Sequence, residues 1–181
     1  MSKNFGNEFI DIYADGGAHN GEDDPMHGIG AWAWVAKTND DIAIVHCGRV
    51  NDTTNNRTEM MAVMEAIKSN PGCQMNIISD SSYVVKGYNH PAYLDAWKNN
   101  GWKTAAHKDV KNRDLWEQLL SLTFHNAVKF TLIHGHYKDQ NEEHAFWNAI
   151  VDNACTDLMR SGISVNETTM MFDIKKKRFI V

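Results

Sequence analysis

The chain has 181 residues, a formal net charge of −5 and a pI near 6.0, with 43% hydrophobic and 23% charged residues. This composition indicates one globular domain with a real core. It excludes a membrane span, because no window reaches the ~18 consecutive apolar residues required. The N-terminal MSKNFGNEF lacks the apolar core of a signal peptide. The odd number of cysteines, without CxxC spacing, argues against a disulfide framework or zinc site and favours the cytoplasm.

One segment is basic although the whole chain is acidic. Overall acidity speaks against a nucleic-acid binder, but six cations between Lys86 and Arg113 face only two carboxylates, which leaves a local net charge of +4. Aromatic residues interleave with these cations, as in grooves that bind a nucleic-acid backbone. The alternative is an ordinary solvated face. The aromatic residues are Tyr88, Tyr93, Trp97 and Trp102.

The first half of the chain predicts three strands and a helix. Alternating apolar residues predict a strand over 9–15 that ends at Asp15, and a glycine-rich turn follows it. Two further strands, 29–36 and 41–49, complete an antiparallel meander. After Asn56, apolar residues at helical spacing predict a helix that Pro71 and Gly72 end.

The second half predicts β-α-β units. Short apolar strands are expected over 74–79 and 128–133, with helices at 83–88, 93–99, 112–125 and 143–160. A meander followed by such units implies a mixed α/β sheet flanked by helices. The whole chain, 1–181, is expected to be one domain with its core over 8–160. Residues 161–181 are weakly patterned and are expected to be a C-terminal extension or tail. Their KKKR is interpreted as a solvated tail or an extra phosphate contact.

Four carboxylates stand at the ends of predicted elements. Asp15 and Asp80 end two strands, and if these strands are parallel and adjacent, both acids lie at one sheet edge, where α/β folds hold ligands. Glu59 falls in the first turn of the first helix, and Asp152 flanks the apolar stripe of the last. Each acid alone could be a helix cap or turn residue. Crowded carboxylates raise one another's pKa, and Mg²⁺ or Mn²⁺ would compensate their charge. Two such ions ~4 Å apart would clamp both reacting oxygens of a phosphodiester.

Five segments in order carry a family resemblance. They read IYADGG, TTNNRTEMMAV, SDSSYV, WKNNGWKTAAHKDVKNRDLW, and HGH followed by NAIVDNAC. Over roughly 8–160 the chain resembles type 1 ribonuclease H. The resemblance implies the ribonuclease H fold, a five-stranded mixed sheet whose fourth and fifth strands run parallel to the first. It also implies hydrolysis of the RNA strand of RNA–DNA hybrids, leaving 3′-hydroxyl and 5′-phosphate ends.

The resemblance also assigns residues. It makes Asp15, Glu59, Asp80 and Asp152 ligands of two Mg²⁺ ions, with Asp15 bridging them, and His136 an aid to proton transfer or product release. His144 is a rival for that histidine role, and His134 lies just upstream. Thr54 and Asn112 match positions that hold a DNA phosphate. The residues expected along the RNA strand are Gly16, Gly17, Asn20, Asn55 and Asn56; Tyr93, Trp97 and Lys103 are further substrate candidates, whereas Trp102 is expected to pack.

Three departures from the family pattern affect these expectations. The loop between His136 and Asn148 is longer than usual, which leaves the histidine assignment open. The turn after Asp15 is longer and more acidic, so the RNA contacts there are in doubt. The WKNNGW segment is less basic, which predicts weaker and more salt-sensitive hybrid binding.

Two other function classes remain open. One is a catalytically inactive hybrid-binding module, which would have no chemical need for all four acids. The other is a nuclease of the same architecture that acts on DNA, such as a resolvase or integrase. Those enzymes lack the TNNRxE segment and the basic region. We expect a monomer.

Overall fold

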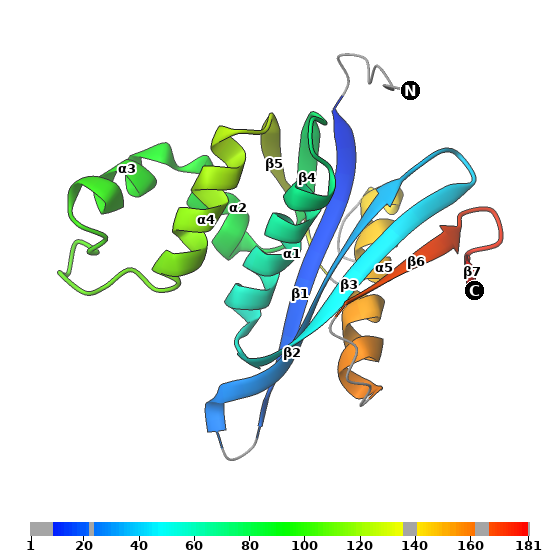
Figure 1. Ribbon diagram of the computed structural model, residues 1–181, viewed down its shortest axis with the longest axis horizontal. Helices are drawn as coiled ribbons and strands as arrows, with labels where there is room; N and C mark the ends of the chain where they lie inside the picture. Colours follow the sequence, from blue (N-terminus) through cyan, green and yellow to red (C-terminus); the bar gives the residue numbers. More distant parts are fainter. Residues whose placement is uncertain (1–8, 22–23, 136–140, 162–166, 181) are drawn as a thin grey trace.

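A computed structural model describes residues 9–21, 24–135, 141–161 and 167–180, which form a seven-stranded sheet with helices on both faces (Figure 1). The strand order is β5-β4-β1-β2-β3-β6-β7. The strands are β1 (Ile10–Gly21), β2 (Asp24–Lys37), β3 (Ile42–Thr53), β4 (Met75–Ser79), β5 (Val128–Leu132), β6 (Glu167–Asp173) and β7 (Arg178–Ile180). The helices are α1 (Asn55–Ser69), α2 (Ser82–Asn89), α3 (Pro91–Asn99), α4 (Arg113–Phe124) and α5 (Glu142–Arg160).

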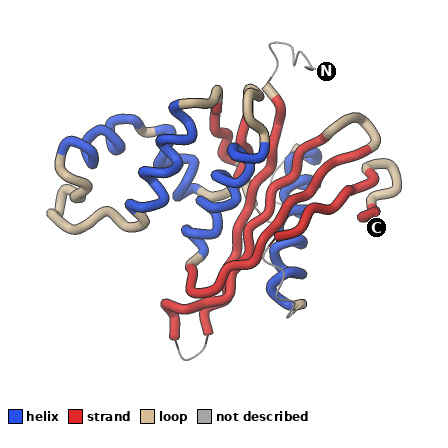
Figure 2. The backbone as a smooth tube through the Cα atoms, viewed as in Figure 1, coloured by secondary structure: helices blue, strands red, loops and turns tan. Residues whose placement is uncertain are grey.

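The sheet is mixed, as the sequence predicts. β1, β2 and β3 form an antiparallel meander, whereas β4 pairs with β1, and β5 with β4, in parallel. The tube view shows α5 on one side of the sheet and the other helices on the opposite side or beyond its edge (Figure 2). The predicted α/β class and the pairing of the first five strands are therefore confirmed.

Two apolar cores hold these layers together. One lies between the sheet and α1, α2 and α4, and buries the helix stripe predicted from Met60, Val63 and Ile67. The other lies between the sheet and α5, where Trp147 and Val151 are buried. Because α1 and α5 pack on opposite faces of β1, this strand is fixed from both sides.

Two predictions about strands are wrong. A sheet of five strands was expected, but within the C-terminal extension β6 pairs along β3 and β7 pairs with β6, so the sheet has seven strands. The three lysines of KKKR lie in the turn between β6 and β7, and the arginine begins β7. Lys175 pairs with Asp41, and Lys176 pairs with Asp173. β1 also continues past Asp15 to Gly21, because its pairing with β2 extends through the glycine-rich segment.

Candidate active site

The register of two parallel strands brings Asp15 and Asp80 together. Pairing between β1 and β4 ends at Tyr13 and Ile78, and each acid lies two residues beyond its strand's last paired residue. Asp80 follows the end of β4, while β1 runs on beside β2 alone. The two carboxylates therefore emerge at the same level of the sheet edge, as the parallel arrangement requires.

Glu59 reaches the same edge from α1. The helix starts at Asn55, so Glu59 lies in its second turn, and the prediction of a first-turn position is wrong. This also removes the interpretation of Glu59 as a helix cap. Its Oε2 accepts a hydrogen bond of 2.5 Å from the Ser81 hydroxyl, which in turn accepts one from Val84 N–H and caps α2. One serine thus fixes both the start of α2 and the orientation of the acid.

Gly16 allows α1 to come this close. A Cβ atom at Gly16 would lie 2.3 Å from the carbonyl carbon of Thr58 and 2.4 Å from the backbone nitrogen of Glu59. Only a residue without a side chain fits between β1 and α1 there. Gly135 has a comparable position on the other side, where a Cβ would lie 2.1 Å from Asp80 Oδ2.

Asp152 approaches from α5, on the opposite face of the sheet. Asn148, one turn earlier, donates a hydrogen bond from Nδ2 to Asp80 Oδ2 at 3.3 Å. The Cys155 thiol contacts the backbone oxygen of Asp15 at 3.6 Å. These two contacts tie α5 to both strands that carry the other acids, so β1, β4, α1 and α5 each contribute one carboxylate.

The charges of the other three acids all act on Asp15. Burial raises the pKa of Asp15 to about 8, and the charge of Asp80 adds to this rise. Asp152 and Glu59 raise it further, while the Gly16 N–H, 2.7 Å from Asp15 Oδ1, opposes the rise. The pKa of Glu59 is also raised, mainly by burial, with a contribution from Asp80. A nearby positive charge would favour the ionised form of these carboxylates and lower their pKa values again.

The donor set fits a hard divalent cation. Carboxylate oxygens are the ligands that Mg²⁺ and Mn²⁺ prefer. The Oδ1 atom of Asn148 is buried without a hydrogen-bond partner among the described residues, so it can accept one more donor, such as a water. As they stand, no three His, Cys, Asp or Glu side chains of the described residues converge closely enough to enclose an ion. Repulsion between ionised carboxylates opposes closer approach without a cation.

The two candidates for the catalytic histidine that the structure describes, His134 and His144, differ in where they lie relative to the four carboxylates. His136 lies outside the described residues. His144 lies eight residues before Asp152 on α5, or ~12 Å along a helix axis. Its Nδ1 is 2.9 Å from the hydroxyl of Tyr13, and Tyr13 belongs to the apolar core between the sheet and α5. His134 is exposed and directly precedes Gly135, which abuts Asp80.

Several predicted RNA-strand contacts line the junction of β1 and α1. Asn55, the first residue of α1, accepts a hydrogen bond of 2.6 Å from the Ala18 N–H, beside Gly16 and Gly17. This contact leaves the Asn55 amino group as a donor. Asn56 is half-buried next to it. The side chain of Asn20 lies outside the described residues.

The predicted phosphate contacts lie side by side at the starts of two helices. Thr54 is the N-cap residue of α1 and Asn112 that of α4, and neither side chain makes a capping hydrogen bond. Arg57 joins the two helices, because its Nη1 is 3.4 Å from Asn112 Oδ1.

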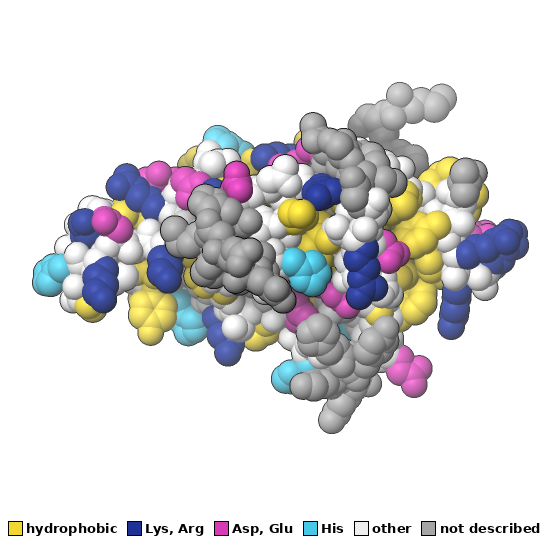
Figure 3. Space-filling view, turned by 90° about the horizontal axis from the view of Figure 1, so that it is seen from below, with side chains coloured by type: hydrophobic (Ala, Val, Ile, Leu, Met, Phe, Trp, Pro, Cys, Tyr) yellow, Lys and Arg dark blue, Asp and Glu magenta, His cyan; other side chains and the backbone are white. Residues whose placement is uncertain are grey.

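Three further candidates meet in one hollow on the protruding end of the molecule. Tyr93, Trp97 and Lys103 line a cavity of about 480 Å³ beside α3, and the Tyr93 side chain is 61% exposed. Lys103 is paired with Asp109. Trp102 is buried, as predicted. Figure 3 shows Lys and Arg side chains over this end and over the opposite end, where the β6–β7 hairpin lies.

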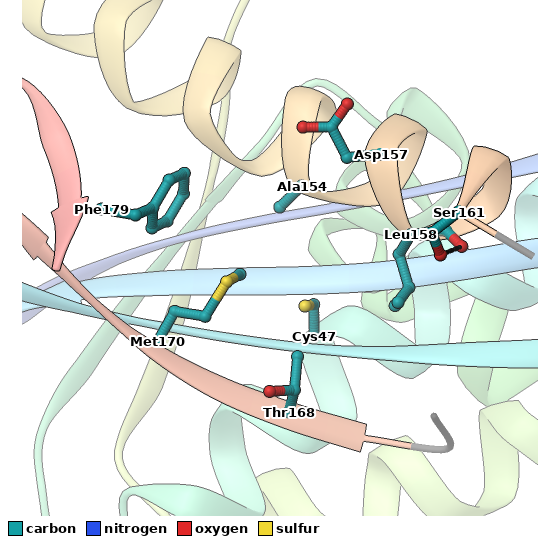
Figure 4. A pocket seen from close by; sticks show the side chains of 8 residues that line it. All are labelled: Cys47, Ala154, Asp157, Leu158, Ser161, Thr168, Met170 and Phe179. Atoms are coloured by element: carbon teal, nitrogen blue, oxygen red, sulfur yellow. Dashed lines mark hydrogen bonds between the residues drawn. The ribbon is translucent and has the colours of Figure 1, made fainter. Parts of the chain in front are cut away.

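A different cavity lies away from the four acids. It has a volume of about 340 Å³ and opens between α5 and the C-terminal hairpin, with mostly apolar walls that include Met170, Leu158 and Phe179 (Figure 4). None of the four carboxylates lines it.

Comparisons with known proteins agree with this geometry. The sequence model of the family described as RNase H matches residues 7–158. The chain belongs to the ribonuclease H family. Ribonuclease H of Francisella philomiragia is 41% identical over 119 residues, covering 65% of this chain and 76% of the relative. Ribonuclease H of Chlorobium luteolum is 36% identical over 155 residues, covering 85% and 94%.

Solved structures show the same fold. LC11-RNase H1, in complex with an RNA/DNA hybrid, superposes with a TM-score of 0.59 at 16% identity, covering 86% of this chain and 99% of that one. The family match ends at residue 158, so β6 and β7 lie beyond the ribonuclease H segment although they extend its sheet.

The sequence did not reveal the residues that hold the acids in place. Ser81 caps α2 and also binds Glu59, and no pattern in the sequence marks the second contact. Asn148 stands in the predicted NxxxD spacing, which was the signal available for its contact with Asp80. Gly135 belongs to the HGH segment, but its close approach to Asp80 depends on the packing of a distant loop.

Proposed function

We propose that this chain is an endoribonuclease that hydrolyses the RNA strand of RNA–DNA hybrids and leaves 5′-phosphate and 3′-hydroxyl ends. The observation that carries the proposal is that Asp15 lies within electrostatic reach of three further carboxylates, from α1, from the end of β4 and from α5: Glu59, Asp80 and Asp152. Raised carboxylate pKa values, such as those of Asp15 and Glu59, are concentrated at functional sites. Family membership supplies the reaction class.

Two Mg²⁺ ions, or Mn²⁺, would be held by Asp15, Glu59, Asp80 and Asp152. When bound, such ions supply an activated water nucleophile and stabilise the leaving oxygen of a phosphodiester.

The chain itself contributes orientation. Ser81 holds Glu59, and Asn148 holds Asp80 by its amino group while its free Oδ1 accepts a donor. His136 would carry a proton or assist product release, as suits an imidazole near neutral pH.

Recognition of the RNA strand would fall to β1 and the start of α1. Asn55 presents an amino group because its oxygen is held by the Ala18 N–H. A donor beside Gly16 and Gly17 suits the 2′-hydroxyl groups and base edges of the shallow minor groove, with Asn20 and Asn56 nearby in sequence. Thr54 and Asn112 would hold the DNA strand by a phosphate.

One assay separates this function from the two alternatives. End-labelled RNA–DNA hybrid, duplex DNA and duplex RNA are each incubated with the protein in Mg²⁺ or EDTA. The proposal predicts that the RNA strand of the hybrid is cleaved in Mg²⁺ and is not cleaved in EDTA. Binding of the hybrid without cleavage would indicate an inactive module, and cleavage of duplex DNA would indicate the resolvase-like class.

We further propose that the chain works as one domain, as a monomer, in the cytoplasm. All of the described β6–β7 hairpin belongs to the same sheet as the site. The three cysteines form no disulfide, which fits a reducing compartment. Among the described residues, no helix combines the length and apolarity needed to cross a bilayer.

A further inference from the structure

Asn112 has a left-handed backbone conformation at the start of α4. Its φ is 56° and its ψ 34°, in a region that asparagine adopts more readily than most residues with a side chain. An asparagine before a helix normally has extended backbone and accepts a hydrogen bond from the helix's first N–H groups. Asn112 does neither. Its conformation therefore serves something other than capping.

The Asn112 side chain is held at both ends instead. Its Oδ1 accepts a hydrogen bond from Arg57 Nη1 at 3.4 Å, and its Nδ2 donates one to the Tyr83 hydroxyl at 3.2 Å. One amide hydrogen remains for an outside acceptor, because a primary amide has two.

The two residues that hold Asn112 are themselves fixed. Arg57 makes a bidentate pair with Asp114, at 3.0 and 2.7 Å. The Tyr83 hydroxyl accepts a hydrogen bond from Trp116 Nε1 at 3.1 Å and donates one to the Lys111 carbonyl at 3.2 Å. Trp116 is fully buried, so this side of the network is anchored in the core.

The network spans three helices that pack side by side (Figure 1): Arg57 comes from α1, Tyr83 from α2, and Asp114 and Trp116 from α4. Next to this network, the protein surface is rich in hydrogen-bond donors. Thr54, which also leaves its own helix uncapped, begins the helical turn that carries Arg57. A free amide hydrogen, a hydroxyl and a guanidinium together suit a phosphate oxygen.

We propose that Tyr83 and the Arg57–Asp114 pair are positioning residues that preset the Asn112 amide for one phosphate of the hybrid's DNA strand. This inference rests on the proposed function, because it takes the hybrid as the ligand. It assigns to Tyr83 and Arg57 an effect on hybrid affinity and not on the chemical step.

The test is Tyr83→Phe, which removes one hydroxyl and keeps the ring that packs on Trp116. Tyr88→Phe is the matched control: it lies on the same helix, and its hydroxyl makes no hydrogen bond with the residues that the structure describes. Affinity for a fluorescent hybrid is measured by anisotropy in EDTA, and cleavage is measured in Mg²⁺. Tyr83→Phe should raise Kd and KM about 3- to 10-fold, the effect expected from loss of the hydrogen bond that holds the Asn112 amide, while kcat and the Tyr88→Phe values stay unchanged.

A second arm ties the effect to a phosphate. Hybrids with a single methylphosphonate are scanned along the DNA strand. The wild type should lose affinity at one position, whereas Asn112→Ala and Tyr83→Phe should lose most of that sensitivity, and adding Tyr83→Phe to Asn112→Ala should cost nothing more.

The outcomes are separable. An unchanged Kd for Tyr83→Phe, or a cost that adds fully to that of Asn112→Ala, overturns the positioning role even if the hybrid is cleaved. Binding with the expected coupling but no cleavage supports it and overturns the proposed activity. A wild type that does not bind the hybrid overturns both.

Discussion

Asp15 and Asp80 each lie two residues beyond the last residue pair that joins β1 to β4, and burial together with the charge of Asp80 raises the pKa of Asp15. This relationship makes the sheet edge a site for positive charge. α1 and α5 then add Glu59 and Asp152 from opposite faces of the sheet. The predictions below test this arrangement one contact at a time.

Removing the negative charge of either Asp15 or Asp80 should abolish cleavage without unfolding the protein. Asp15→Asn and Asp80→Asn should each leave well under a few per cent of wild-type activity in Mg²⁺. Without metal, Asp15→Asn should melt higher, by about 2–4 °C for each kcal/mol of repulsion relieved. Asp11→Asn, an exposed change on the same strand, is the control. Activity of several per cent in Asp15→Asn would refute the metal assignment.

The stability of the metal-free protein should depend on pH through Asp15. Its pKa in the folded state, about 8, exceeds the unfolded value near 3.8, so the folded protein binds the proton more tightly. The resulting stabilisation is complete below about pH 4 and is lost as pH rises towards 8. In EDTA, the melting temperature of the wild type should therefore fall relative to that of Asp15→Asn across this interval. Parallel curves for the two proteins would show that Asp15 is not perturbed.

Ser81→Ala should weaken both the fold and the reaction. It removes the cap of α2, which costs about 1 kcal/mol, and releases Glu59. We expect kcat to fall about 10-fold, the rate equivalent of a 1.4 kcal/mol loss of orientation. Ser82→Ala, at the exposed neighbouring position, should change neither quantity. Full activity in Ser81→Ala, measured well below its melting temperature, would mean that Glu59 needs no such support.

Two adjacent glycines should respond differently to alanine. At Gly16 the new Cβ would strike the backbone of α1, whereas at Gly17 it would meet only the flexible end of Met159 at 3.3 Å. Gly16→Ala should cost about 1–3 kcal/mol or more, as overpacking does, and Gly17→Ala clearly less. Thermal melting of the two variants measures the difference. Equal melting temperatures would contradict the close contact between β1 and α1.

Releasing Lys103 should strengthen hybrid binding. Asp109 holds this lysine at the edge of the hollow that Tyr93 and Trp97 line. Asp109→Asn should raise affinity and steepen the slope of log Kd against log salt by about 0.9 for one added phosphate contact. Asp95→Asn makes the same charge change on α3 and controls for net charge. If both variants change the slope equally, Lys103 does not contact the substrate.

The sequence predicted the elements with strong local patterns and missed those made by distant pairing. The apolar stripe of α1 and the short buried strand β4 followed from periodicity. β6 has no such signal, because only Phe172 in it is buried, and it forms by pairing along β3. The glycine-rich extension of β1 reads as a turn, yet pairing with β2 outweighs that local preference.

For the site as well, the sequence predicted what local patterns mark and missed what depends on contacts between distant segments. The four carboxylates could be proposed because strand ends, helix faces and family motifs mark them in the chain. The contacts that orient them and their neighbours, such as Ser81 with Glu59 or Tyr83 with Asn112, join residues from different elements. Their geometry depends on how α1, α2 and α4 pack, which no local pattern encodes.

The most direct test of the central claim is the rate of RNA-strand cleavage in an end-labelled RNA–DNA hybrid as Mg²⁺ is titrated, for the wild type and Asp15→Asn. The account predicts no cleavage in EDTA, a rate that rises with Mg²⁺ for the wild type, products with 5′-phosphate ends, and no cleavage by Asp15→Asn at any Mg²⁺ concentration. Metal-independent cleavage, or wild-type rates in Asp15→Asn, would contradict it.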